Sequence, residues 1–421
     1  MKRIAETPTD YTRPYRPWPV AAFNALARRT PRTGPLRRLD ADRMLANARK
    51  RTRLQDLGDA GCLTALRVLV RAINEEAELT PTGVLLQKQR IEGALANRLR
   101  VQQMLKRHPE IHDLELGKVV LIAGLQRTGT TALHRLLASH PDMRALMSWE
   151  ALNPAPLPSE GERGFGRRLR HARLAERTIA YLAPAFFAVH PIAHDAPEED
   201  ILLLDLSFMS QTPEATMHVP SYAKWLEGQD HAPAYRDLRT LLRILHWQRP
   251  ANHWVLKTPH HLEHLDAVLA TFAEVTVVQT HRDPQVALAS FLSMVAHGRG
   301  VFSDRIDAEA IARHWTAKAC RMIERAEAAR RQADPNRFVD VLYHDLMRDP
   351  QAQLERIYRQ AGIPFCAEAQ EAAARTLQRN PQHRHGKHIY SAAHFGLNGT
   401  KVGDGFAAYR ARYRIPSESS P

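Results

Sequence analysis

The residues best suited to chemistry lie at 124–131, where two glycines and three threonines surround one arginine. Gly124 and Gly129 have the spacing that lets a backbone turn wrap an anion, with N–H groups and the positive end of a following helix pointing at it. This is also the spacing of a nucleotide phosphate-binding loop. Thr130, however, stands where the ATP-hydrolysing versions carry the lysine that reaches the outer phosphates. The segment therefore predicts an oxyanion site whose cation is Arg127.

The flanks of this loop indicate the elements that position it. Residues 118–123 form a short apolar, β-branched run typical of a buried strand, and residues 130–140 have the pattern of a helix. Three later runs, at 253–257, 275–279 and 338–343, have the same strand character and are each followed by a helical stretch. Strands that alternate with helices indicate a parallel sheet covered on both faces.

Apolar residues at three-to-four spacing before the first strand predict a helical region. The fold expected is therefore α/β: a three-layer, P-loop-like fold around a central parallel sheet, with added N-terminal helices. We divide the chain into a basic, flexible arm at 1–38, a helical region at 39–115 packed on the main domain, and a main domain at 116–416. Within the main domain, the long irregular stretch 151–250 is expected to form a substrate wall.

Charge and composition narrow the classes of partner. The 421 residues carry 59 Lys and Arg against 45 Asp and Glu, a net charge of +14, and 12 − 4 = 8 of this excess lies in residues 1–50. A nucleic-acid footprint should lie on a folded face with aromatics to stack, so we expect no nucleic acid. A solvated arm is the favoured interpretation, and peripheral contact with anionic lipid stays open.

The sequence offers no evident route into or across a membrane. No apolar run is long enough for a bilayer, and Pro19 and Asn24 interrupt the stretch 18–27 that follows the first basic residues. Three scattered cysteines give neither a disulfide framework nor a thiolate zinc site. We expect a cytoplasmic protein of unknown oligomeric state.

The ends of the later strands are cationic. ATP chemistry needs an acid that holds magnesium near the phosphates, yet one strand ends in Lys257 and another leads through His281 into Arg282. A phosphate-binding loop beside basic residues favours transfer of a group less charged than phosphoryl, and the sulfuryl group is one.

At this point the motifs resemble those of the PAPS-dependent sulfotransferases, in particular a bacterial branch, over residues 39–413. Residues 126–131 are similar to the 5′-phosphosulfate loop, usually Pro-Lys-Ser-Gly-Thr-Thr, and residues 278–284 with Ser290 are similar to the 3′-phosphate site. The resemblance implies 3′-phosphoadenosine 5′-phosphosulfate (PAPS) as co-substrate and no metal. It implies that the 5′ end is held by Arg127, Thr128, Gly129, Thr130 and Thr131, and the 3′ phosphate by Arg282 and Ser290, with Arg384, Gly386 and Lys387 closing over it.

The general base has two candidates. Cytosolic members of the family have Lys-Thr-His where this chain has Lys257, Thr258 and Pro259, and proline cannot accept the proton. Members of the bacterial branch place a histidine two residues later, at His261, and Glu150 is the rival. We prefer His261, since an imidazole titrates near neutral pH whereas a carboxylate needs burial to become as basic. Arg127 and Lys257 would stabilise charge on the departing phosphate.

Competing interpretations stay open. Residues 260–264 match H-x-x-E-H, a zinc-peptidase pattern, although the 22 histidines make a chance match easy. A nucleotide-dependent P-loop kinase and a catalytically dead nucleotide-binding module are also compatible with the loop motif. The acceptor is expected to be a small-molecule or lipid alcohol. Candidate residues to orient or wall it are His194, Glu198, Glu199, Phe186, Phe187 and Trp225.

Overall fold

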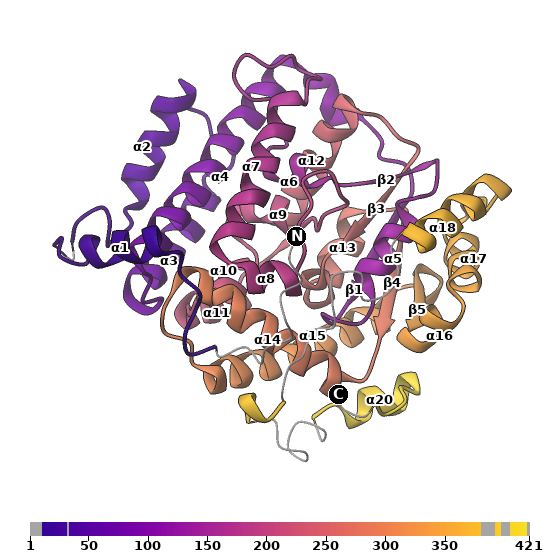
Figure 1. Ribbon diagram of the computed structural model, residues 1–421. Coiled ribbons are helices and arrows are strands. Elements are labelled where there is room, and N and C mark those ends of the chain that lie inside the picture. Colours follow the sequence, from indigo (N-terminus) through magenta and orange to yellow (C-terminus); the bar gives the residue numbers. More distant parts are fainter. Residues whose placement is uncertain (1–10, 32, 380–391, 397–404, 419–421) are drawn as a thin grey trace.

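A five-stranded parallel sheet organises the computed structural model, which describes residues 11–31, 33–379, 392–396 and 405–418 (Figure 1). The strand order is β2-β3-β1-β4-β5. The strands are β1 Val119–Gly124, β2 Met143–Ala145, β3 His253–Lys257, β4 Val275–His281 and β5 Phe338–Leu342. The central strand β1 is buried throughout and pairs with β3 on one side and β4 on the other.

The register of these pairs decides where the chemistry gathers. Ile122 lies opposite Lys257 in β3, and Gly124 lies opposite Thr280 in β4. Because all the strands are parallel, the turns that follow β1, β3 and β4 leave the sheet at the same edge. The strand order also reverses at β1, and ligands of open α/β sheets bind at such a point.

Helices cover both faces of the sheet, which confirms the predicted layers. Alternate residues of β1, such as Leu121, pack with α12 Ala232–Gln248, α13 Leu265–Thr271, α14 Pro284–Phe302 and α15 Ala308–Gln332. The residues between them, such as Ile122, pack with α5 Thr130–Leu137, α17 Pro350–Ala361 and α18 Ala367–Arg379. This alternation is the period-two pattern of a strand buried on both faces.

The N-terminal helices form a core of their own. Helices α2 Ala41–Thr52, α3 Gly61–Glu76 and α4 Pro81–Arg107 bury their apolar faces against one another and against Phe208, Met217 and Tyr222. Arg98 of α4 also donates to Asp237 of α12 at 2.7 Å, so this core is tied to the main sheet. Helices α2, α3 and α4 lie together at the left of Figure 1.

The remaining elements complete the two cores. Those before β3 are α1 Trp18–Ala27, η1 Pro109–Asp113, α6 Ser148–Leu152, α7 Gly166–Leu182, α8 Pro184–Val189, α9 Ile201–Leu204, η2 Asp205–Ser207, α10 Thr212–Thr216 and α11 Pro220–Glu227. Those after it are η3 Pro259–Glu263, η4 Pro335–Arg337, α16 Tyr343–Arg348, η5 Ala392–Phe395 and α20 Ala407–Tyr413. No helix among the described residues is long and apolar enough to cross a membrane.

Two local features differ from the sequence-based expectations. Strand β2 is missing from them because its three residues include Arg144, which is buried with its guanidinium 4.4 Å from the Trp254 ring. The arm expected to be flexible contains α1, which packs on α4. The segment just before α1 is held by Arg16, which donates to Gly300 O at 2.6 Å and to Ser303 O at 3.0 Å.

Candidate active site

The loop after β1 is a tight turn that needs glycine at two positions, for two different reasons. A Cβ at Gly124 would lie 2.2 Å from Thr280 Oγ1 and 2.9 Å from Thr280 O, so β4 approaches too closely for a side chain. Gly129 has a φ of 88°, and even Arg127 has a φ of 68°. Arg127 is therefore held in a conformation that costs a non-glycine residue energy, as is frequent at ligand-binding turns.

The hydroxyl of Thr128 braces this turn from inside. It is fully buried, donates to Leu125 O at 2.6 Å and lies 2.7 Å from Thr280 Oγ1. Thr130 is buried and Thr131 is exposed at the start of α5. The loop residues expected to hold the donor thus divide into a structural hydroxyl at Thr128 and groups nearer the surface.

The two anion-binding motifs meet in space. Arg282 follows β4 and donates from Nη1 to the backbone oxygen of Arg127 at 3.1 Å. Arg127 in turn donates from Nε to Ser290 Oγ, on α14, at 3.0 Å. Arg127 lies 155 residues before Arg282 and 163 residues before Ser290 in the chain. These contacts therefore join the three residues into one cationic site.

The guanidinium of Arg282 holds a carboxylate. Glu418, from the segment after α20, accepts from Arg282 Nη2 at 2.8 Å and from Nε at 3.0 Å, and His344 Nε2 lies 3.3 Å from the same carboxylate. The Tyr343 ring supports the guanidinium from 4.0 Å. Burial would raise the pKa of Glu418, but the hydrogen bonds and charge of Arg282 outweigh it and lower that pKa. Arg282 is thus oriented to grip an oxyanion through two hydrogen bonds.

At the end of β3, Lys257 meets an acid from the long stretch between β2 and β3. Its Nζ donates to Glu199 Oε1 at 2.5 Å, and the hydroxyl of Thr258 donates to Glu199 Oε2 at 3.4 Å. The Lys257 side chain is 5% exposed and that of Glu199 is 22% exposed. Glu199 therefore combines a link to the site cation with partial access to solvent.

His261 lies behind this pair. Its side chain is fully buried, with Nε2 2.7 Å from Asp200 Oδ2 and Nδ1 2.9 Å from the Tyr235 hydroxyl. Asp200 also accepts from the backbone N–H of Lys257 at 2.9 Å. Burial would raise the pKa of Asp200, but His261 and the backbone donors lower it. Both ring nitrogens of His261 face protein groups, so this arrangement suits a residue that positions Lys257.

Glu150, the rival base, is enclosed in a separate ion cluster. It is buried, lies 2.5 Å from Arg144 Nη2 and 3.2 Å from Arg249 Nη2, and accepts from the Met147 backbone N–H at 3.0 Å. These contacts join β2, α6 and the end of α12. Among the described contacts, none links Glu150 to Arg127, Lys257 or Arg282.

The candidate acceptor residues are dispersed. His194 lies 2.6 Å from Glu176 Oε2, Glu198 accepts from Ser148 Oγ at 3.2 Å, and Trp225 packs on the N-terminal core. Helix α8, with the half-buried Phe186 and Phe187, packs on α14. It leads directly to His190.

His190, which the sequence interpretation passed over, lies at the end of α8 close enough to the site for its charges to affect the pKa of the imidazole. Its burial lowers its pKa, while Glu198 and Glu199 oppose that shift and Lys257 and Arg127 add to it. Charges from the loop, from β3 and from the 151–250 stretch therefore act on one imidazole.

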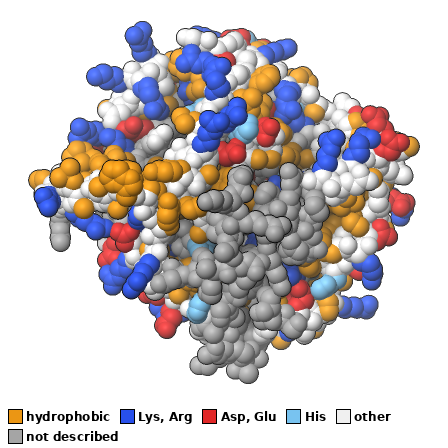
Figure 2. Space-filling model, viewed as in Figure 1, with side chains coloured by type: hydrophobic (Ala, Val, Ile, Leu, Met, Phe, Trp, Pro, Cys, Tyr) orange, Lys and Arg blue, Asp and Glu red, His pale blue; other side chains and the backbone are white. Residues whose placement is uncertain are grey.

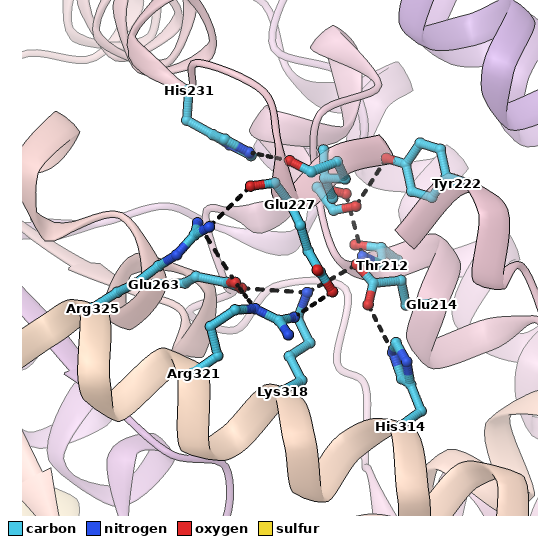
Figure 3. A network of polar contacts seen from close by, with 12 residues as sticks. Thr212, Glu214, Tyr222, Glu227, His231, Glu263, His314, Lys318, Arg321 and Arg325 are labelled. Atoms are coloured by element: carbon cyan, nitrogen blue, oxygen red, sulfur yellow. Dashed lines mark hydrogen bonds and ion pairs between the residues drawn. The ribbon is translucent and has the colours of Figure 1, made fainter. Parts of the chain in front are cut away.

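The zinc-peptidase interpretation fares poorly in the structure. Glu263, its would-be base, lies 2.8 Å from Arg321 Nε and 3.3 Å from Lys318 Nζ. In Figure 3, Lys318 also pairs with Glu214 of α10 and Arg321 with Glu227 of α11, so these ion pairs tie η3 to α15.

The two histidines of the pattern do come together with a third. His231, His260 and His264 are buried with one potential ligand atom each within 4.8 Å of one another. Burial and mutual proximity lower the pKa of His260 and His264, and the charge of Lys318 adds to this. The rings of His231 and His264 stack at 3.6 Å, so their in-plane lone pairs run side by side. Neutral imidazole is also the form that binds metals, so it is the stacked rings and the nearby Lys318 ammonium that disfavour a metal centre.

Arg384, Gly386 and Lys387, expected to close over the donor, lie outside the described residues. The structure brings in four residues to which the sequence interpretation gave no role: His190, Asp200, Tyr343 and Glu418. Asp200 had a weak signal, since it follows two acids after Pro197 in the expected substrate wall. Nothing in the sequence singled out Glu418.

Comparison with known proteins agrees with this geometry. The model of the sulfotransferase family matches residues 120–367, which include the loop, the end of β3, Arg282 and Ser290. The chain belongs to the sulfotransferase family. Sulfotransferase STF1 from Mycobacterium tuberculosis H37Rv is 35% identical with a TM-score of 0.78, over 88% of this chain and 99% of that one. Sulfotransferase STF9 from Mycobacterium avium is 27% identical with a TM-score of 0.81, over 90% and 98%.

Two curated sulfotransferases extend the comparison. Omega-hydroxy-beta-dihydromenaquinone-9 sulfotransferase Stf3 from Mycobacterium bovis and its counterpart from M. tuberculosis are each 25% identical over 265 residues. The match covers 58% of this chain and 62% of theirs. The family and the fold of the chain are therefore settled, and the two nearly full-length structural matches place it beside bacterial sulfotransferases.

Proposed function

We propose that this sulfotransferase moves the sulfuryl group of PAPS to an alcohol oxygen. The observation that carries the proposal is the hydrogen bond from Arg282 to the backbone oxygen of Arg127 at 3.1 Å. Because this contact puts Arg282 beside the loop, one ligand could present one anion to the loop and a second anion to Arg282. Adenosine with phosphate groups at its 3′ and 5′ positions has two such anions.

The residues present fit this donor. Arg282 already holds one carboxylate through Nε and Nη2, so a 3′ phosphate can take the same two hydrogen bonds. The close approach of β4 to Gly124 leaves backbone rather than side chain at the start of the loop. Arg127, Gly129, Thr130 and Thr131 would hold the 5′ end, and Ser290 would orient Arg127. PAPS supplies the sulfuryl group, and nothing in this proposal assigns work to a metal.

For the proton we propose Glu199. Its carboxylate is partly exposed and bonded to Lys257 at 2.5 Å, whereas His261 and Glu150 are enclosed by protein partners. Glu199 would accept the proton of the acceptor hydroxyl while that oxygen bonds to sulfur. The bond from sulfur to the bridging phosphate oxygen breaks, and adenosine 3′,5′-bisphosphate leaves.

Lys257 and Arg127 would then stabilise the charge that grows on the departing phosphate. Preorganised donors of this kind act without moving, and loss of one typically costs about a hundredfold or more in rate. Asp200 and His261 would keep Lys257 in place, since Asp200 accepts from the Lys257 backbone N–H.

For the acceptor we propose a lipid or other apolar alcohol. The half-buried Phe186 and Phe187 on α8 lie just before His190, and the curated relatives are named for a hydroxylated menaquinone. Three free cysteines suit a cytoplasmic location.

Calorimetry separates this function from a kinase and from a dead binding module. Adenosine 3′,5′-bisphosphate should bind wild type much more tightly than ATP, and Arg282→Ala should lose most of that affinity. Arg359→Ala is the matched control, because Arg359 is an exposed arginine on α17 that pairs with Glu355 one turn away. Preference for ATP with magnesium would favour the kinase, and tight binding without turnover of PAPS by any alcohol would favour the dead module.

A further inference from the structure

The first described helix, α1 Trp18–Ala27, has its polarity reversed. Its buried residues are Asn24 and Ala27, and Asn24 Oδ1 accepts from Thr82 N at 2.9 Å and from Thr82 Oγ1 at 2.8 Å. Its large apolar side chains point to solvent: Trp18 is 80% exposed and Leu26 is 66% exposed. A helix whose only role is to pack on the rest of the protein would bury its apolar side chains and expose its polar ones.

The exposed apolar residues are concentrated there. Among the described residues, eleven large hydrophobic side chains are exposed, and four of them fall within twelve consecutive positions: Tyr15, Trp18, Phe23 and Leu26. Figure 2 shows a broad apolar field at the left of the molecule, where Figure 1 places α1. Contiguous apolar surface of this kind marks an interaction site.

The charges in the chain segment that contains α1 are all of one sign. Residues 11–39 contain seven arginines and no aspartate or glutamate. Arg13, Arg28, Arg29 and Arg38 are exposed, so the apolar helix has guanidinium groups on both sides of it in the chain. Apolar side chains with tryptophan and a border of arginine are the composition that partitions into the interface of an anionic bilayer.

The anchoring of this segment keeps the surface fixed. Arg16 and Arg28 pair with Asp304 at 2.9 and 2.5 Å, and the Tyr11 hydroxyl lies 2.6 Å from Ser293 Oγ on α14. Because α14 also carries Ser290, which bonds Arg127, one helix links this surface to the donor site.

We infer that α1 and its flanking arginines form a docking surface for anionic lipid membranes. Trp18, Phe23 and Leu26 enter the interface, while the exposed arginines contact lipid phosphates. A second copy of this chain is a poorer occupant, because two copies of the same arginine-rich surface would face each other and repel. This inference stands apart from the proposed reaction, since it uses no residue of the active site.

Vesicle binding of the full chain tests it. We expect binding to vesicles of phosphatidylcholine with phosphatidylglycerol, at least tenfold weaker binding to phosphatidylcholine alone, and a further loss as NaCl rises from 0.1 to 0.5 M. The variant Trp18→Ala/Phe23→Ala/Leu26→Ala should bind at least tenfold more weakly. Arg13→Glu/Arg29→Glu should lose the preference for the anionic lipid.

A matched control and a folding check make the result decisive. Met347→Ala/Leu377→Ala removes two exposed apolar side chains on α16 and α18 and should bind vesicles as wild type does. All variants should keep wild-type affinity for adenosine 3′,5′-bisphosphate, which shows that the fold is intact. Equal vesicle binding by wild type and the α1 variant overturns the inference. So does a wild-type dimer, seen by light scattering, that the α1 variant converts to monomer without any vesicle binding by either.

Discussion

Glu418 provides the sharpest perturbation of the donor site, because it occupies the guanidinium that we assign to the 3′ phosphate. Its carboxylate makes two hydrogen bonds with Arg282 at 2.8–3.0 Å and lies 3.3 Å from His344. The donor must displace it. Glu418→Gln keeps the shape of the side chain and removes its charge, so adenosine 3′,5′-bisphosphate should bind more tightly.

The size of the effect follows from this contact. The Glu418 and Arg282 side chains are 14% and 20% exposed, which places their pair between an exposed ion pair of at most about 1 kcal/mol and a buried charged hydrogen bond of about 1.5–3 kcal/mol. Loss of about 1–2 kcal/mol of competition corresponds to a 5–30-fold gain in affinity. The pKa of Glu418 is lowered in the folded protein. The carboxylate that competes with the donor for Arg282 therefore keeps its charge until the pH falls through this lowered pKa. Measurements between pH 6 and 8 therefore see the full effect.

Calorimetry with two ligands and matched variants can refute this reasoning. Adenosine 5′-monophosphate lacks the 3′ phosphate and should bind Glu418→Gln and wild type alike. Asp345→Asn removes an acid whose partner is the exposed Arg348 and should leave all affinities unchanged. In an Arg282→Ala background, Glu418→Gln should have no effect, because the two act through one contact. Unchanged affinity for adenosine 3′,5′-bisphosphate in Glu418→Gln would show that Arg282 does not hold the 3′ phosphate.

Three further results are expected. Glu199→Gln should lower kcat by about 10²–10⁴-fold with unchanged affinity for adenosine 3′,5′-bisphosphate, and a wild-type rate would remove Glu199 as the base. Gly124→Ala should lower both Tm and donor affinity because its Cβ would lie 2.2 Å from an oxygen of β4, whereas Gly228→Ala meets its nearest neighbour at 3.7 Å and should do neither. The pKa of Asp200 is lower in the folded state than the unfolded pKa near 3.8. The ionised carboxylate therefore stabilises the fold above pH 3.8, and this stabilisation is lost as the pH falls through the folded-state pKa. Acid unfolding of Asp200→Asn should therefore depend less steeply on pH, and an identical acid limb would contradict this.

Most strands were predictable from sequence because a strand buried on both faces consists of a short run of apolar residues. β1, β3, β4 and β5 are short apolar runs, each within two residues of the predicted range. β2 was missed because it has only three residues and one of them is the charged Arg144. The guanidinium of Arg144 packs on the ring of Trp254, which is far from it in the sequence. The parallel order then explains why the loop and Arg282 meet: their strands are neighbours.

From the sequence, Glu199 was a candidate to orient the acceptor, but the cations with which the acids of the site pair could not be predicted. Glu199 lies 58 residues from Lys257, and Glu418 lies 136 residues from Arg282. Such pairs depend on how the 151–250 stretch and the C-terminal segment fold back, which local patterns do not encode. Local patterns also did not show that His261 is buried between Asp200 and Tyr235, which is why we propose that it positions Lys257 instead of acting as the base.

The central claim is that the Gly124 turn and Arg282 grip one doubly anionic adenosine donor of sulfuryl groups. Transfer of ³⁵S from labelled PAPS to an apolar alcohol, followed with excess EDTA or with magnesium, tests it most directly. The account predicts labelled product at equal rates in both conditions and a loss of more than about tenfold in kcat/KM for PAPS in Arg282→Ala. Absence of label in every alcohol tried, or transfer that Arg282→Ala leaves intact, would contradict it.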